Sequence, residues 1–199
     1  MKQLHRKDLF GWSVFNEERN IDFHSVLWVR DEGNVLIDPL PMSEHDHHHL
    51  QRLGGVRFIV VTNSDHCRDA GHVAHTTGAM LYGPAAEEDS FPLYCDRWLY
   101  DGDEVVPGLQ TYVLNGSKTP GELALLLEHS TLITGDLIRS HVGGELCLLP
   151  DAKLSDRKQA VQSVKRLAHI TNIQAVLTGD GWPIFNHGSE ALHHLARSL

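Results

Sequence analysis

Three short polar clusters each follow directly after an apolar run that has the length of a β-strand. These clusters are Thr62–His66 after Ile59–Val61, Gly135-Asp136 after Leu132–Thr134, and Gly179-Asp180 after Val176–Thr178. Carboxylates placed just past strand ends, beside glycines, are how α/β sheets assemble a site at one rim. Asx turns or helix caps could explain any single cluster. Two of the three repeat the pattern apolar–Thr–Gly–Asp, however, so we predict that the clusters meet at one rim.

The residue types in these clusters are suited to metal binding and proton transfer. Carboxylate oxygens of Asp65, Asp136 and Asp180 can bind zinc, manganese or magnesium. His66 is a candidate proton-transfer group or ligand. A fourth loop, Gly116–Gly121, contains Lys118 and lies where it could complete the rim.

Composition excludes several classes of protein. The 199 residues have 17 Lys and Arg against 26 Asp and Glu, a formal net charge of −9. Such a chain offers no positive field to nucleic acid or to an anionic membrane. No apolar run is long enough for a membrane span, and the first residues lack the apolar core of a signal peptide. The three cysteines are far apart and form no CxxC pair. We therefore expect a cytoplasmic protein without disulfides.

The order of apolar runs and turn residues predicts one domain over residues 1–199. A hairpin over 24–38 is followed by a helix over 43–53 capped by Ser43. A strand over 56–61, a helix over 66–77 and a strand over 79–82 form a unit that favours parallel pairing. Further strands are expected over 109–114, 122–127, 131–134 and 174–178. Helices are expected from Ser155 or Asp156 onward and after a cap at Ser189.

The motifs in this order resemble the metallo-β-lactamase superfamily. The segments that carry the resemblance are Val35–Asp38, Val61–His66, Lys118–Leu125, Leu132–Leu137 and Leu177–Gly181. The chain resembles the glyoxalase-II-like branch and, more closely, a divergent bacterial subgroup of metal-dependent hydrolases. The resemblance implies an α/β fold of the αββα type, a four-layer sandwich of two mixed β-sheets flanked by helices. It also implies that the site lies at one edge.

The metal-binding motif of that superfamily is strongly altered here. Its loop usually reads Thr-His-x-His-x-Asp-His, and two further histidines and a bridging aspartate complete the ligand set. When the loop is aligned on Thr62 and Gly71, its four ligand positions hold Asn63, Asp65, Cys67 and Arg68. The two later histidines are replaced by Lys118 and Asp180. The bridging aspartate is matched by Asp136, and Asp38 matches a supporting aspartate.

Two interpretations of this altered site stay open. In the first, Asp65, Asp136 and Asp180 bind one divalent ion, which could be Zn, Mn or Mg. In the second, the site is free of metal, and Arg68 and Lys118 supply positive charge to the three carboxylates.

Two functions correspond to these interpretations. The first is hydrolysis of a small ester or thioester, with Asp136 as the central carboxylate and His66 as the proton-transfer group. Lys118 and Arg68 would then stabilise an anionic oxygen. The alternative is a non-catalytic, metal-free relic whose Lys/Arg/Asp cleft binds a small anionic ligand or serves as a scaffold for a homo-oligomer. In either case the partner is a small molecule, and Asn63, Trp182 and His141 are expected to contact it.

A run of histidines over 45–49 also suggests metal binding, because His45 and His49 are four residues apart on one helical face. We expect this run to lie on an exposed outer helix with only adventitious metal affinity.

Overall fold

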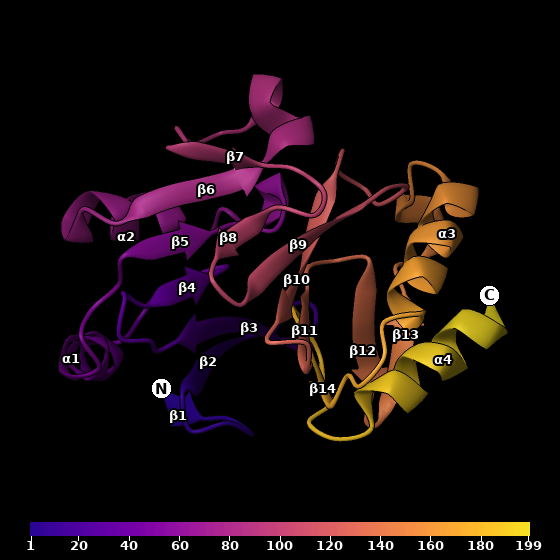
Figure 1. Ribbon diagram of the computed structural model, residues 1–199, viewed down its shortest axis with the longest axis horizontal. Helices are drawn as coiled ribbons and strands as arrows, with labels where there is room; N and C mark the ends of the chain where they lie inside the picture. Colours follow the sequence, from indigo (N-terminus) through magenta and orange to yellow (C-terminus); the bar gives the residue numbers. More distant parts are fainter.

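The computed structural model describes residues 1–199 as two β-sheets packed face to face, with helices on the outer face of each (Figure 1). This arrangement confirms the αββα sandwich. The first sheet has the order β1-β2-β3-β4-β5-β6-β7. Its strands are β1 Lys2–Gln3, β2 Leu9–Asn16, β3 Ile21–Trp28, β4 Val35–Ile37, β5 Phe58–Val60, β6 Met80–Pro84 and β7 Arg97–Leu99.

The second sheet has the order β14-β11-β10-β9-β8, and β12 and β13 form a separate pair. The strands are β8 Glu104–Val106, β9 Leu109–Leu114, β10 Glu122–Leu127, β11 Thr131–Thr134, β12 Ile138–Val142, β13 Glu145–Leu148 and β14 Ala175–Thr178. The helices are α1 Glu44–Arg52, α2 Ala70–Thr77, α3 Arg157–Ala168 and α4 Gly188–Ser198. Helices α1 and α2 cover the first sheet, and α3 and α4 cover the second (Figure 1). None of the four helices is long and apolar enough to cross a bilayer.

The burial pattern of β10 shows how the layers are held together. Leu123, Leu125 and Leu127 belong to the cluster between the two sheets, and Ala124 and Leu126 belong to the cluster beneath α3 and α4. Successive side chains of a strand point to opposite faces, so this strand is apolar on both. A third cluster fills the space beneath α1 and α2.

Strand direction determines where the polar clusters lie. The pairs β4–β5, β5–β6 and β11–β14 are parallel, which confirms the predicted strand–helix–strand unit. Asp38 and Thr62 therefore follow neighbouring parallel strands in one sheet. Asp136 and Asp180 follow neighbouring parallel strands in the other. The two pairs of strand ends meet at one rim of the sandwich, as the sequence predicts.

Two helix starts differ from the prediction. The helix expected from His66 begins at Ala70, because the Ser64–His66 segment forms a separate 3-10 turn in which the Asn63 side chain accepts a hydrogen bond from Asp65 N. Helix α4 begins at Gly188, and the hydroxyl of Ser189 instead accepts a hydrogen bond from Ile173 N. The caps predicted at Ser43 and Asp156 are confirmed.

Candidate functional site

Asp38 anchors the rim. It has a left-handed backbone, with φ of 48°, directly after β4. Its carboxylate accepts hydrogen bonds from Thr62 N at 2.8 Å, from Thr62 Oγ1 at 2.6 Å and from His66 Nδ1 at 2.7 Å. All three residues are buried. Asp38 thus joins the ends of β4 and β5 and orients the His66 ring, which agrees with a supporting role.

His66 lies between two carboxylates. Its Nδ1 faces Asp38, and its Nε2 is 3.5 Å from Asp136 Oδ2. Burial by itself lowers the pKa of His66, but the charge of Asp38 and the hydrogen bonds to Asp136 and Asp38 raise it to about 9. At neutral pH the ring is therefore an imidazolium. A charged, buried ring donates hydrogen bonds and cannot act as a base.

The glycines of the two Thr–Gly–Asp motifs leave room for neighbouring site residues. Neither Gly135 nor Gly179 has a positive φ, so a tight turn does not require them. A Cβ on Gly179 would lie 2.7 Å from His66 Cε1. A Cβ on Gly135 would lie 2.9 Å from Asn63 Nδ2 and from Glu122 Oε1. Both positions need glycine because site residues pack directly against the backbone.

Lys118 lies between two of the expected metal ligands. Its Nζ is 2.6 Å from Asp65 Oδ2 and 2.8 Å from Asp136 Oδ2. Asn63 Nδ2 also donates to Asp136 Oδ2, at 3.2 Å. Burial alone would raise the pKa of Asp136, but His66 and Lys118 hold it well below its usual range. The same carboxylates raise the pKa of Lys118 against the effect of burial.

Arg68 serves the backbone of the rim. Its guanidinium donates to the carbonyl oxygens of His24 at 2.7 Å, Asp38 at 3.1 Å and Gly179 at 3.3 Å. It also stacks on Phe23, with Cζ 5.5 Å from the ring centroid. These bonds join β3, β4 and the segment after β14. Arg68 thus has a structural role. Its guanidinium is engaged by backbone carbonyl oxygens, which does not match the expectation that it stabilises a substrate oxygen.

Asp180 has direct partners other than Lys118. Its carboxylate is bound by Arg139, with Nε at 3.0 Å from Oδ1 and a second contact from Nη2 to Oδ2. His141 Nε2 lies 3.4 Å from Oδ1. Asp65, Lys118 and Asp136 thus meet through direct ion pairs, whereas Asp180 is bound by Arg139; the charges of both Asp136 and Asp180 act on the Arg68 guanidinium. Strand β12, which the sequence analysis did not predict, provides the arginine that neutralises Asp180.

The expected metal-ligand set is not assembled. No group of three or more His, Cys, Asp and Glu side chains has an arrangement that could hold a metal ion. The ammonium of Lys118 lies between Asp65 and Asp136, where a divalent cation would have to bind both. Burial raises the pKa of the Cys67 thiol to about 12, so this thiol is protonated at neutral pH. The donor set does not fit the metal that the superfamily implies, and the assignment of Asp65, Asp136 and Asp180 as ligands is not supported by the geometry.

Glu122 is a site residue that sequence reasoning missed. It is fully buried; Ser117 Oγ donates to it at 2.6 Å and Leu137 N at 2.9 Å. Burial and the charge of Asp136 raise the pKa of Glu122 to about 7. Through its hydrogen bonds with Ser117 and Leu137, Glu122 connects the loop that bears Lys118 to the loop that bears Asp136. A charged residue at the start of an otherwise apolar strand was the available signal.

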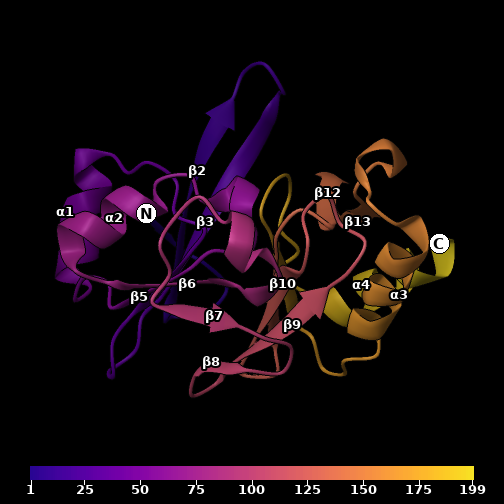
Figure 2. The ribbon, with the colours of Figure 1, turned by 90° about the horizontal axis from the view of Figure 1, so that it is seen from above.

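Trp182 and His141 line a cleft beside this core. The cleft has a volume of about 350 Å³ and runs between the β2–β3 hairpin and the loop after β14. The hairpin projects well beyond the sheet (Figure 2). Trp182 is 64% exposed and Phe15 is 52% exposed, and both border the cleft. Arg19, also on its wall, has its Cζ 5.9 Å from the Phe23 ring that Arg68 contacts as well.

The family follows from the sequence and the fold together. The family model of the metallo-beta-lactamase superfamily matches residues 1–199, so the chain belongs to that superfamily. Among solved structures, a metallo-beta-lactamase from Pontibacter korlensis is 17% identical, with 98% of this chain and 97% of that chain covered and a TM-score of 0.75. A metallo-beta-lactamase from Erythrobacter litoralis with beta-mercaptoethanol in its active site is 16% identical, with coverage of 98% and 94% and a TM-score of 0.75.

A third structure, TTHA1623 in a di-iron-bound form, is 22% identical, with coverage of 84% of this chain and 91% of that chain and a TM-score of 0.66. At these identities the likeness to solved structures shows the fold alone. No curated protein matches the sequence.

The charge on His66 predicts how stability changes with pH. The pKa of His66 is raised in the folded protein, so its contribution to the free energy of unfolding is complete below pH 6.5. This contribution is lost as pH rises through about 9. We expect the free energy of unfolding to fall by on the order of 3 kcal/mol across this interval. The His66→Gln variant should be less stable and should lose this decrease above pH 7.5. Denaturant unfolding at several pH values measures both effects.

The exposed His48 provides the control, because His48→Gln should keep the wild-type pH profile. An unchanged slope in His66→Gln would show that the ring is not charged in the fold.

Proposed function

We propose that this protein is a metal-independent member of the superfamily that binds a small anionic ligand and does not hydrolyse it. The observation that carries the proposal is the Lys118 ammonium, which contacts Asp65 at 2.6 Å and Asp136 at 2.8 Å. A fixed ammonium repels a divalent ion and supplies positive charge that the two carboxylates need.

The chemistry of the core favours binding over ester or thioester hydrolysis. Water activation needs a base that is unprotonated and can reach the substrate. His66 is buried and protonated at neutral pH, because its pKa is raised to about 9. Asp136 is buried and engaged by Lys118, Asn63 and His66. The thiol of Cys67, with a pKa of about 12, is a weak nucleophile.

The cleft beside the core offers a suitable place for an anion. Arg19 and His141 lie on its walls together with the carboxylate of Asp22, so Arg19 is the cation available to a ligand there. The nearby charge of Asp180 is balanced by Arg139. The exposed rings of Phe15 and Trp182 supply flat apolar surfaces. These features support a ligand with a flat apolar body and one carboxylate or phosphate group.

The proposal predicts that metals have no effect on stability. Chelation of the purified, untagged protein should leave its melting temperature unchanged, and stoichiometric zinc or manganese should leave it unchanged too. The reason is that Lys118 already occupies the position between the carboxylates. The measurement is best made on a His45→Gln/His49→Gln variant, because the surface histidine run could bind metal by itself. Near-stoichiometric metal in this variant, or esterase activity that chelation removes, would contradict the proposal.

The cleft predicts a graded response to anions. Phenyl phosphate should bind more tightly than inorganic phosphate, because only the former can also pack on Trp182. Arg19→Ala should weaken phenyl phosphate binding by about tenfold, which is the loss of one charge-assisted contact. Arg52→Ala, which removes an exposed arginine on α1, is the control and should bind like wild type. Calorimetric titration measures these affinities, and equal binding by Arg19→Ala and wild type would refute the assignment of this cleft.

A further inference from the structure

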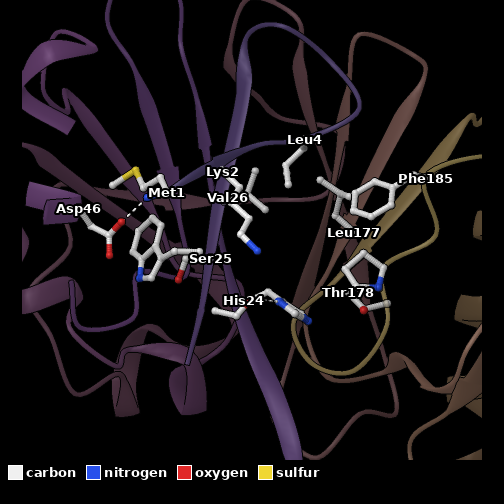
Figure 3. Close-up of a pocket in the computed structure, with 14 residues that line it drawn as sticks. Met1, Lys2, Leu4, His24, Ser25, Val26, Asp46, Leu177, Thr178 and Phe185 are labelled. Carbon is white, nitrogen blue, oxygen red and sulfur yellow. Dashed lines mark hydrogen bonds and ion pairs between the residues drawn. The ribbon is translucent and has the colours of Figure 1, made fainter. Parts of the chain in front are cut away.

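A second cavity lies between the two sheets on the side of β1, β2, β3 and β14 (Figure 3). Its volume is about 400 Å³, within the range of small-molecule pockets. It shares no lining residue with the cleft of Trp182, and none of Asp65, Lys118 and Asp136 borders it. It is therefore a separate space from the proposed anion cleft.

The walls of this cavity are largely apolar. Leu4, Val26, Leu177 and Phe185 border it, and Figure 3 shows these side chains around a common space. Gly11 helps to keep the space open, because a Cβ at this position would lie 3.1 Å from Ser25 O and 3.4 Å from the Leu4 methyl groups. An apolar chain could replace water against these side chains.

One polar group on the cavity wall is without a partner. Thr178 is only 2% exposed, and its Oγ1 makes no hydrogen bond. A buried hydroxyl without a partner is destabilising, and such groups are rare in folded proteins. The other polar side chains here are satisfied: His24 contacts Ser13 Oγ at 2.9 Å and Gly181 O at 2.6 Å, and Ser25 Oγ donates to Asp38 O at 2.7 Å. Thr178 thus has a hydrogen-bonding capacity that a ligand could use.

Lys2 supplies the positive charge of this cavity. It pairs with Gly11 in the β1–β2 register, and Figure 3 shows its ammonium directed toward the middle of the cavity. Asp46 is the only carboxylate among the lining residues, and it is bound to the terminal ammonium of Met1. Lys2 is an exposed residue, and no carboxylate other than Asp46 lines the cavity beside its ammonium.

We propose that this cavity binds a small amphipathic carboxylate. The apolar chain lies against Val26, Leu177 and Phe185, and the carboxylate accepts hydrogen bonds from the Lys2 ammonium and the Thr178 hydroxyl. The match rests on an apolar wall, one cation and one buried donor without a partner. This inference is independent of the proposed function of the other cleft.

Octanoate is the probe, and 1-octanol is the matched neutral ligand with the same chain length. Calorimetric titration of the wild-type protein should give saturable binding of one octanoate per chain, with weaker binding of 1-octanol. Lys2→Met keeps the apolar stem but removes the charge. It should weaken octanoate binding by about tenfold and leave 1-octanol binding unchanged. Lys7→Met, which alters an exposed lysine in the turn after β1, should match wild type.

Thr178→Val gives a second readout that separates this proposal from a simple packing role. The variant has nearly the same shape and lacks the hydroxyl without a partner. It should melt at a higher temperature than wild type when no ligand is present, and it should bind octanoate more weakly. Octanoate binding that does not saturate near one per chain, or equal binding by wild type and Lys2→Met, would overturn the proposal. A lower melting temperature for Thr178→Val would show that the hydroxyl is already satisfied, and would overturn it too.

Discussion

The ion pairs of Lys118 with Asp65 and Asp136 are the interaction on which the rest of the site depends. Carboxylates gathered at one rim repel each other and are costly to bury unless positive charge lies between them. Here each carboxylate of the rim has a cationic neighbour. The pairs are Asp38 with His66, Asp65 and Asp136 with Lys118, and Asp180 with Arg139. Protein side chains thus provide the compensation that metal ions would provide in a carboxylate-rich centre.

The charged residues of the rim follow two pairs of parallel strands, β4–β5 in the first sheet and β11–β14 in the second. Asp136 and Asp180 follow the neighbouring strands β11 and β14 and share the local pattern Thr–Gly–Asp, yet their environments differ. Asp136 faces the Lys118 loop, whereas Asp180 faces Arg139 on β12. The aspartates of the two Thr–Gly–Asp motifs therefore have different cationic partners, because the two strand ends contact different neighbouring segments. Glu122 holds the Lys118 loop next to the Asp136 loop, because it accepts hydrogen bonds from Ser117 Oγ and Leu137 N.

Much of this arrangement could be predicted from the sequence, and the remainder has identifiable physical reasons. Apolar runs located β5, β10, β11 and β14, and the resemblance to the superfamily supplied the four-layer order. The Asp180–Arg139 pair could not be predicted, because it joins residues 41 positions apart and β12 has a polar sequence that hides its strand character. The charge of His66 depends on two carboxylates from other strands, so no local pattern reports it. The unsatisfied hydroxyl of Thr178 also becomes visible only once the sheets are packed.

A double-mutant cycle between Lys118 and Asp136 tests the central claim most directly. Lys118→Met and Asp136→Asn would be compared singly and together by denaturant unfolding of metal-free protein. Direct charge compensation predicts that each single variant is destabilised and that the double variant is more stable than the sum implies, with a coupling of about 1.5 kcal/mol or more. Additive effects, with coupling below about 0.5 kcal/mol, would show that Lys118 does not compensate Asp136.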